Sequence, residues 1–375
     1  MNEQETIYAI ALTLVDTFNP IIVQELYERL GSATAVMEHR KNIRDILPDC
    51  SQRLAERLAN IDKYLQRAEE EWQYAVQHHI VPLCMNDEHY PQRLRECADA
   101  PSVLFYRGKA DLNPLRVISI VGTRQCTRYG QDLVRRFISD LRSLCPQTLV
   151  ISGLAYGIDI HAHRQALSCG LDTVAVLAHG HDNLYPSVHK DTAAAMLQQG
   201  GLITEYPTHT RPDKMNFVKR NRIVAGMSDA CILVESSAKG GGLITARIAF
   251  DYNRDVFAFP GRTDDIHSEG CNCLIRDNVA NLISNAEDFV RAMQWDDDKR
   301  LKDAQRKGIE RQLFPDLSPE EQQVVTVLQI TNDLPINMLT IQSGIAVSKL
   351  TAILFTLEMK GVVRMMAGST CHLLK

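Results

Sequence analysis

The sequence predicts an α/β protein with a parallel, doubly wound sheet, preceded by a helical region and followed by a winged-helix unit. Two observations predict the sheet. Short apolar strands alternate with amphipathic helices from about residue 117 to residue 290, a pattern typical of a parallel sheet with helices on both faces. Three of these strands end in glycine-bearing turns that begin helices. Bare backbone N–H groups should therefore gather at one edge of the sheet, where an anion can reach them.

The first region, residues 1–75, is predicted to form a small bundle of four or five helices, because its apolar residues recur at helical spacing. A proline-rich connecting segment follows, up to about residue 115.

The second region, residues 76–293, contains the predicted sheet. The predicted strands are residues 117–121, 149–152, 173–178, 202–205, 231–235 and 256–259. The predicted helices are residues 130–144, 158–168, 190–199, 243–252 and 286–293.

Residues 294–316 are dense in charge and predict a linker or a solvated helix. In the last region, residues 317–375, Ser318 and Pro319 are typical of a helix start, with an N-cap followed by proline at the first helical position. Three short helical patterns and a closing pair of strands follow, which is the arrangement of a winged helix.

The composition and charge of the chain exclude several classes of protein. The chain has 375 residues, 45% of them hydrophobic, and none of its apolar runs is long enough to cross a membrane. Its first residues, MNEQETIYAI, do not resemble a signal peptide, so we expect a cytoplasmic protein. The 10 scattered cysteines predict reduced, mostly buried thiols. A formal net charge of -5 argues against a surface covered in nucleic acid but leaves room for a local basic groove.

The glycine turns are the strongest functional signal. They read IVGTR at residues 120–124, SGLAYGID at 152–159 and GGGLITA at 240–246. Any one of them is explained equally well by tight packing of a helix on a sheet. Three such turns with polar or basic residues after them favour anion binding. Because no G-x-G-x-x-G spacing surrounds Gly122, an ordinary nicotinamide enzyme is not indicated.

The stretch RPDKMNFVKRNR, residues 211–222, places five cations and Phe217 around a single acid. Cations for a phosphate backbone and a flat ring for a base are what single-stranded nucleic acid requires. A solvated charged loop is the plain alternative. Arg124 follows the first glycine turn, at the sheet edge where ligands of such folds sit, and its planar guanidinium suits phosphate.

No cofactor or metal site is predicted. His161 and His163 are two residues apart and point in different directions on a helix, and Cys271 and Cys273 form a lone C-x-C, so neither pair completes a ligand set. Ser152 does not lie in a G-x-S-x-G turn, so a hydrolase nucleophile is not supported.

Taken together, the motifs resemble the DprA family, also called Smf, of bacterial DNA-processing proteins. The matching pieces stand in order over about residues 75–290: YPQRL, APSVLFYRG, IVGTR, SGLAYGID, VLAHGHDNLYP, TEYP, RNRIVAG, GGGLITA and FAFPG. The C-terminal stretch LEMKGVVRMMAG, residues 357–368, resembles the winged-helix tail of many members. The resemblance implies an extended Rossmann-like domain for residues 76–293 and a SAM-like helical domain for residues 1–75.

The resemblance also implies a function. Members of the family are not enzymes; they bind single-stranded DNA in a basic pocket, form homodimers and help to load the RecA recombinase. Such a protein protects processed or incoming DNA during natural transformation and recombination. Carried over by motif, the DNA-binding residues would be Gly122, Arg124, Gly153, Gly157, Lys214, Phe217, Arg220, Asn221, Arg222, Gly242 and Thr245.

The sequence departs from the family pattern in three places. Gly240, Gly241 and Gly242 replace a serine-glycine-serine, which removes hydroxyl contacts and leaves backbone N–H contacts. The N-terminal region lacks the glycine hairpin that grips a DNA backbone. The winged helix offers a single cation, Lys349, near its recognition helix, so it favours contact with a protein at least as much as reading of a duplex.

Two other functions stay open. The chain could be a nucleotide-binding enzyme like the LOG-type phosphoribohydrolases, although the turn at Lys239 lacks the proline and the closing Gly-Thr of their motif. In that reading Glu235 would be the candidate acid. It could also be a scaffold whose C-terminal unit contacts partners.

Overall fold

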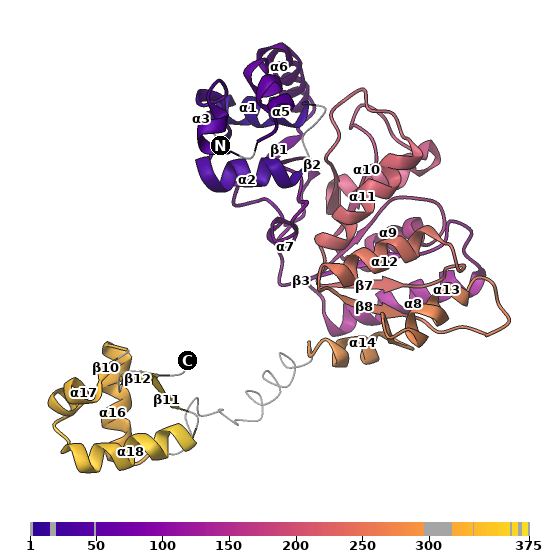
Figure 1. Ribbon diagram of the computed structural model, residues 1–375. Helices are drawn as coiled ribbons and strands as arrows, with labels where there is room; N and C mark the ends of the chain where they lie inside the picture. The colour runs from indigo at the N-terminus through magenta and orange to yellow at the C-terminus, as the bar shows by residue number, and fades with distance from the viewer. Residues whose placement is uncertain are drawn as a thin grey trace. The chain divides into compact units, whose positions relative to one another are not determined.

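The structure is a computed structural model that describes residues 3–15, 20–48, 50–295, 317–332, 334–360, 362–366 and 370–373. The chain divides into two compact units, residues 1–295 and residues 296–375 (Figure 1).

The first unit begins with six described helices, α1 (Glu3–Thr13), α2 (Pro20–Leu30), α3 (Ala33–Glu38), α4 (Ile43–Ile46), α5 (Gln52–Ala59) and α6 (Asp62–Gln77). The sequence predicted four or five, and α6 continues past the expected boundary at residue 75. These helices bury their apolar residues together with Val103 and Phe105 of the adjoining sheet. The helical region and the sheet therefore share a hydrophobic core.

Nine described strands form the sheet of this unit. They are β1 (Val81–Cys84), β2 (Val103–Gly108), β3 (Arg116–Val121), β4 (Thr148–Ser152), β5 (Thr173–Val176), β6 (Gly200–Thr204), β7 (Ala230–Leu233), β8 (Asp255–Ala258) and β9 (Asn281–Leu282). Their order is β1-β2-β6-β5-β4-β3-β7-β8-β9. The strands from β6 to β9 run parallel, whereas β1 and β2 are antiparallel to their neighbours. The sheet is thus mostly parallel.

The two antiparallel strands correct the prediction of a connecting segment. Both lie in the stretch whose prolines suggested an irregular connection. Pro82 is accommodated because β1 is the edge strand, where a residue without an N–H group breaks no interior ladder.

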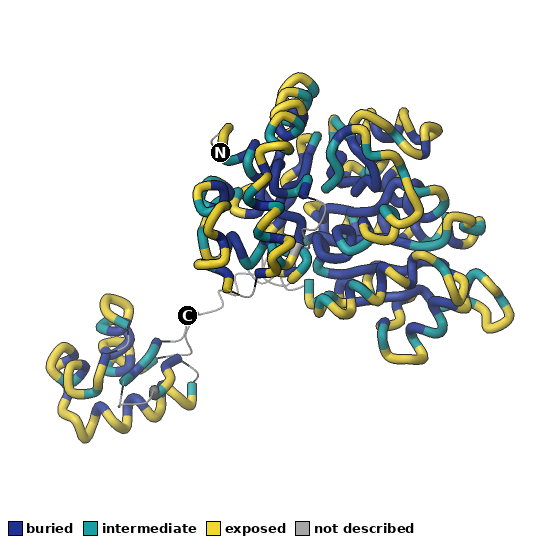
Figure 2. Tube along the Cα trace, turned by 45° about the horizontal axis from the view of Figure 1, so that its top comes forward, coloured by how far each residue is buried: buried dark blue, intermediate teal, exposed yellow. Residues whose placement is uncertain are grey.

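Helices cover both faces of the sheet. One face packs on α8 (Arg128–Leu144), α9 (Ile158–Cys169), α10 (Lys190–Gln199) and α14 (Ala286–Ala292). The other packs on α11 (Lys214–Gly226), α12 (Gly241–Asp251) and α13 (Glu269–Arg276). The strands between these layers are almost entirely buried, and Figure 2 shows buried residues gathered in the interior of this unit. The doubly wound α/β prediction is confirmed.

Helix α11 was not predicted, because basic residues interrupt the apolar residues of its first two turns, KMNFVKR. Its buried apolar residues lie near its C-terminal end, where Ile223, Val224 and Ala225 pack on the sheet. In Figure 1, α11 lies beside α12. The basic stretch of the sequence is therefore an ordered helix and not a loop.

Strand β3 is the point where the winding reverses. The chain goes from β3 through β4 and β5 to β6 on one side, then returns through α11 to β7 on the other side of β3. The carboxyl ends of β3, β4 and β7 thus flank a topological switch point, the usual ligand position in such sheets.

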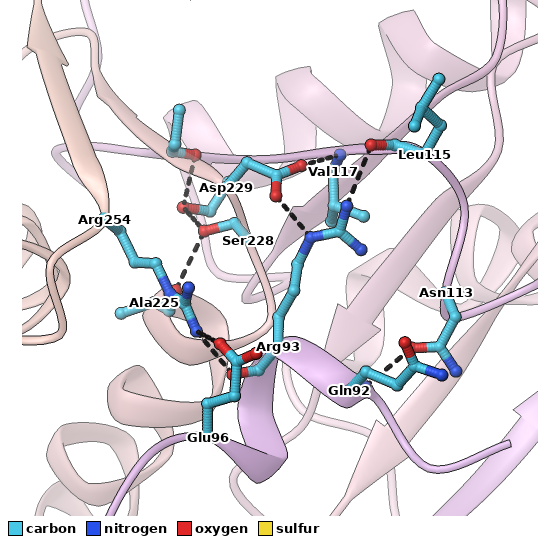
Figure 3. A network of polar contacts seen from close by, with 12 residues as sticks. Gln92, Arg93, Glu96, Asn113, Leu115, Val117, Ala225, Ser228, Asp229 and Arg254 are labelled. Carbon is cyan, nitrogen blue, oxygen red and sulfur yellow. Dashed lines mark hydrogen bonds and ion pairs between the residues drawn. The ribbon is translucent and has the colours of Figure 1, made fainter. Parts of the chain in front are cut away.

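A polar network lies at the amino-terminal ends of β3 and β7, on the side of the sheet opposite the switch point (Figure 3). Asp229 accepts hydrogen bonds from Arg93 Nε at 2.6 Å and from the backbone N–H of Val117 at 2.8 Å. Arg93, in the short helix α7 (Gln92–Arg95), also donates to the carbonyl of Leu115 at 3.0 Å, and its own carbonyl accepts from Arg254 at 2.6 Å. These contacts hold α7 against the amino-terminal ends of β3 and β7.

The second unit contains three helices and a small sheet among its described residues. The helices are α16 (Pro319–Ile330), α17 (Ile336–Ser343) and α18 (Val347–Met359), and the strands are β10 (Leu334–Pro335), β11 (Val363–Met366) and β12 (Thr370–Leu373), in the order β10-β12-β11. The predicted start of α16 is confirmed, since Ser318 caps the helix, Pro319 is its first residue, and Ser318 and Glu321 form a capping box. Most of the predicted linker, residues 296–316, lies outside the described residues.

Within the described residues, no single helix is long and apolar enough to cross a membrane, and α17 and α18 pass that test only as a pair bent by 106°.

Candidate nucleic-acid interface

A pocket of about 810 Å³ opens at the switch point of the sheet. The turn after β3, the turn after β4, the turn before α12 and one side of α11 line it, and Tyr185 closes it from the loop after β5. Of the eleven residues that the sequence singled out, nine line this pocket: Gly122, Arg124, Gly153, Lys214, Phe217, Arg220, Asn221, Gly242 and Thr245. Gly157 and Arg222 do not.

Backbone hydrogen bonds join the first two glycine turns to each other and to the segment that follows β7. The N–H of Thr123 donates to the carbonyl of Glu235 at 2.7 Å, and the N–H of Ile158 donates to the carbonyl of Thr123 at 3.2 Å. Gly157 has a φ of +77°, and a Cβ there would lie 2.1 Å from the Thr123 carbonyl oxygen. Gly157 therefore serves the packing of the turns, the plainer of the two roles considered for these glycines.

Helix α12 presents backbone N–H groups to the pocket. It begins at Gly241 behind Gly240, and no side chain caps its first turn. The N-terminus of α11 differs, because Asp213 accepts hydrogen bonds from the N–H groups of Met215 and Asn216. The uncapped first turn of α12 can donate to an anion, and the helix dipole favours negative charge there.

Arg124 lies over the ring of Phe217 in the lining of the pocket. The Arg124 guanidinium lies 5.0 Å from the centre of the Phe217 ring, and the ring of Tyr185 lies 5.7 Å from the Phe217 ring on a tilted plane. Arg124 is exposed and Phe217 is half-buried. A charged group and aromatic rings thus stand together, as stacking sites for single strands require.

The charge balance of the pocket is basic. Four lining residues are basic and two are acidic. Both acids are engaged with backbone N–H groups: Asp213 caps α11, and Asp159 accepts from Gly153 at 3.1 Å. Arg124, Lys214 and Lys239 are the exposed cations. Lys239 was not among the predicted DNA-binding residues, although it stands directly before Gly240 in the third glycine turn.

Arg220 is a structural cation and corrects the expectation of a free phosphate ligand. It is 3% exposed, and its guanidinium donates to the carbonyl of Gly153 at 2.7 Å and to that of Val176. A Cβ on Gly153 would come within 2.3 Å of this guanidinium. Arg220 thus forms the floor of the pocket and holds the ends of β4 and β5 in place.

Arg222 points away from the pocket. Because Arg222 follows Arg220 by two positions on α11, its side chain leaves the helix on roughly the opposite side. On that side Arg222 forms an ion pair with Glu205, and its Nε lies 3.8 Å from a carboxylate oxygen of Asp99. Its position corrects the expectation that the whole RNR motif lines one site, because only the first two residues of the motif reach the pocket.

Buried ionisable groups support the floor. Burial raises the pKa of Asp159, and the neighbouring Arg220 and backbone N–H groups oppose that rise. One turn further along α9, His163 is fully buried and hydrogen-bonded to Thr173 at 2.7 Å. Burial lowers the pKa of His163 to about 3, with the charge of Arg220 acting in the same direction.

Glu235, the acid considered for an enzyme, does not line the pocket. It is buried, and its carboxylate accepts hydrogen bonds from the hydroxyl of Thr127 at 2.5 Å and from the N–H of Thr127 at 2.9 Å. These contacts fix the beginning of α8 and occupy both carboxylate oxygens.

Comparison with known protein families identifies both parts of the chain. The family described as DNA recombination-mediator protein A matches residues 82–294. The family described as DprA winged helix domain matches residues 310–369, which confirms the winged-helix prediction for the C-terminal unit.

Individual proteins that resemble this chain belong to the same family. The DNA processing protein DprA of Streptococcus pneumoniae is 36% identical over 209 residues, which are 56% of this chain and 73% of that protein. The protein Smf of Escherichia coli is 31% identical over 313 residues, which are 80% of this chain and 79% of that protein.

Two solved structures share the fold. The X-ray structure of DprA from Streptococcus pneumoniae superposes with a TM-score of 0.65 at 32% identity, covering 76% of this chain and 97% of that one. The structure of DNA processing protein A from Helicobacter pylori superposes with a TM-score of 0.52 at 28% identity, covering 58% of this chain and 96% of that one. The latter work describes a single-stranded DNA binding mode for the Helicobacter protein.

Proposed function

Because the chain belongs to the DprA family of DNA recombination mediators, we propose that it binds single-stranded DNA in the pocket at the switch point of its sheet. The observation that supports this best is the joint position of Arg124, Phe217 and the uncapped start of α12 on one pocket. Cations, a ring and backbone donors are the three contacts that a single strand uses.

The roles follow from exposure. Arg124, Lys214 and Lys239 are exposed and contact backbone phosphates. The N–H groups of Gly241 and Gly242 hold one phosphate oxygen more closely. Phe217, with Tyr185 beside it, stacks a base. Arg220 and Asp159 lie beneath and keep the glycine turns in place.

Salt-dependent binding tests the proposal. Three phosphate contacts on a single strand give a slope of log K against log salt of about -2. The substitution Arg124→Ala should weaken binding of a dT20 oligonucleotide about ten- to hundredfold, because a charged hydrogen bond contributes about 1.5–3 kcal/mol. It should also make the slope shallower by about 0.7.

Arg135→Ala is the matched control, since Arg135 is an exposed arginine on α8 whose partner is Asp132 and not the pocket. Fluorescence anisotropy at several salt concentrations measures both variants. Parent-like affinity of Arg124→Ala, or an equal loss in both variants, would contradict the proposed site.

We infer further that the protein passes its DNA to the RecA recombinase and acts as a homodimer during DNA processing, including natural transformation. Family membership supports this role. A stopped-flow measurement of RecA filament growth on strands covered by single-strand-binding protein should show faster nucleation with this protein present. Sedimentation equilibrium should give twice the mass of one chain, 42.2 kDa. Unchanged filament growth would separate DNA binding from RecA loading.

The proposed role is binding without catalysis. The occupied carboxylate of Glu235 supports it over a phosphoribohydrolase. Incubation with nucleoside monophosphates should release no free base above background. Turnover that disappears in Glu235→Gln, with the fold retained, would favour the enzyme instead.

A further inference from the structure

We propose that the DNA path continues from the pocket onto a second stacking position, formed by Tyr156 and His189 and flanked by Arg164 and Lys190. This position would take at least one further nucleotide of the same single strand. The inference deepens the proposed function and rests on it.

Tyr156 is an aromatic side chain held at the surface. It lies in the turn between β4 and α9, is 46% exposed, and meets the ring of His189 edge-on, with the ring centres 5.2 Å apart. His189 is 3% exposed, and its Nδ1–H donates to the carbonyl of Leu154 at 2.9 Å. The buried histidine thus gives Tyr156 a fixed support, and a preorganised ring costs less entropy when a base stacks on it.

The second position adjoins the pocket, because chain neighbours of both its rings line the pocket and a hydrogen bond joins the two segments. Ala155, the residue before Tyr156, lines the pocket, and so does Tyr185, four residues before His189. Tyr185 is positioned by its N–H group, which donates to Nε2 of His179 at 3.1 Å. The hydrogen bond from His189 to Leu154 joins the loop of Tyr185 to the turn of Tyr156. One short segment therefore contributes a ring contact at each end, Tyr185 with Phe217 and His189 with Tyr156.

Two cations accompany the second position. Lys190 follows His189 directly at the start of α10, and it is exposed. Arg164 is exposed on α9, and its Nε donates to the hydroxyl of Thr192 in α10 at 3.1 Å, which holds it beside the helix that Lys190 begins. Asp191 is the acid of the first turn of α10. Cations beside an exposed aromatic ring repeat the chemistry of Arg124 with Phe217, which suits a sugar–phosphate chain that carries another base.

Oligonucleotide length is the variable that tests this inference. Binding of dT oligonucleotides of increasing length, from dT3 to dT20, should be measured for the full chain and for Tyr156→Ala. Oligonucleotides that fill only the pocket should bind the two proteins equally. Longer ones should bind Tyr156→Ala about five- to hundredfold more weakly, because one stacked base contributes about 1–3 kcal/mol. Tyr156→Phe, which keeps the ring, should behave as the parent at every length.

Tyr129→Ala is the matched control, since Tyr129 is 52% exposed but outside both stacking positions. Equal affinity of Tyr156→Ala and the parent at every length would overturn the inference. An equal loss at every length, including dT3, would overturn it too, because Tyr156 would then act within the pocket or on the fold. A urea unfolding midpoint identifies an effect on the fold.

The salt dependence of binding gives a second test, through the two cations Arg164 and Lys190. With Arg164 and Lys190 added to the three cations of the pocket, five phosphate contacts should give dT20 a salt slope of about -3.5. Joint replacement Arg164→Gln and Lys190→Gln should make that slope shallower by about 1.4 and leave the slope for dT3 unchanged. Arg124→Ala separates this inference from the proposed function. If Arg124→Ala binds all lengths normally while Tyr156→Ala does not, the pocket assignment fails and the stacking position at Tyr156 remains. If both bind normally, both fail.

Discussion

Three arginines in and beside the pocket have different tasks. Arg124 is exposed and lies over the ring of Phe217, whereas Arg220 is buried beneath the pocket. Arg222, on the side of α11 that faces away from the pocket, pairs with the acid Glu205. Charge alone does not distinguish them. Their partners do, because a guanidinium that is already bound to carbonyls or carboxylates is not free to bind phosphate.

Arg220→Ala should destabilise the fold. The substitution leaves Asp159 buried without its cation and the carbonyls of Gly153 and Val176 without their donor. A buried carbonyl that loses a charged hydrogen-bond donor costs about 1.5–3 kcal/mol, so the two carbonyls together should cost about 3–6 kcal/mol. Urea unfolding should show this decrease, whereas the exposed Arg124→Ala should change the free energy of unfolding by less than about 0.5 kcal/mol. A similar small change in both variants would refute the structural role of Arg220.

Stability should fall in mild acid because of His163. Its pKa is lowered to about 3 in the folded state, whereas an unfolded histidine has a pKa of about 6.5. Between these values the unfolded chain binds the proton and the folded chain does not, so stability decreases as pH falls. From pH 6 to pH 4.5 this one group should remove about 2 kcal/mol.

Urea unfolding at the two pH values measures that effect. His163→Leu should make the pH dependence shallower, while a replacement of the exposed His89 should leave it as in the parent. An unchanged slope in His163→Leu would mean that His163 is protonated in the folded protein.

At the scale of elements, the glycine turns pack the ends of the strands together, in addition to their proposed role as backbone N–H donors to phosphate. Their backbone hydrogen bonds hold the ends of β3, β4 and β7 in one arrangement. The site is therefore preformed by the sheet, and α11 and α12 complete it from one side.

Gly157→Ala and Gly241→Ala should separate these two uses of glycine. At Gly157 a positive φ and a Cβ 2.1 Å from the Thr123 carbonyl oxygen should cost at least about 1–3 kcal/mol of stability. At Gly241 a Cβ would meet nothing within 4 Å, so alanine there should be neutral or slightly stabilising. Thermal unfolding of the two variants measures the contrast, and equal melting temperatures would count against it.

The elements that the sequence predicted best are those with a strong period. Amphipathic α8 and the buried strands β3, β4 and β7 lie close to their expected bounds. The antiparallel β1 and β2 were missed because prolines within β1 and just before β2 suggested an irregular connection. Helix α11 was missed because basic residues interrupt the apolar residues of its first half. For the site, motifs indicated the right turns, but the choice between exposed Arg124 and buried Arg220 depends on packing of distant strands.

At the scale of the whole chain, the two units should behave independently. Each has its own hydrophobic core, and the boundary follows Trp295, whose ring packs on Phe289 and over Arg116. A protein ending at residue 295 should bind dT20 within about twofold of the full chain, because the pocket lies wholly in the first unit. Anisotropy titration tests this, and a large loss would show that the winged helix contributes to DNA affinity.

The core shared between the N-terminal helices and the sheet has a practical consequence. Glu71 of α6 accepts hydrogen bonds from Thr208 at 2.7 and 2.9 Å, and Val103 and Phe105 are covered by the same helices. Removal of the first 75 residues to obtain a minimal DNA-binding fragment would expose the apolar sheet face around Val103 and Phe105, next to the edge strand β1. Such a fragment should precipitate or self-associate, and its failure to shift DNA on a gel would report damaged solubility and not the loss of a binding site.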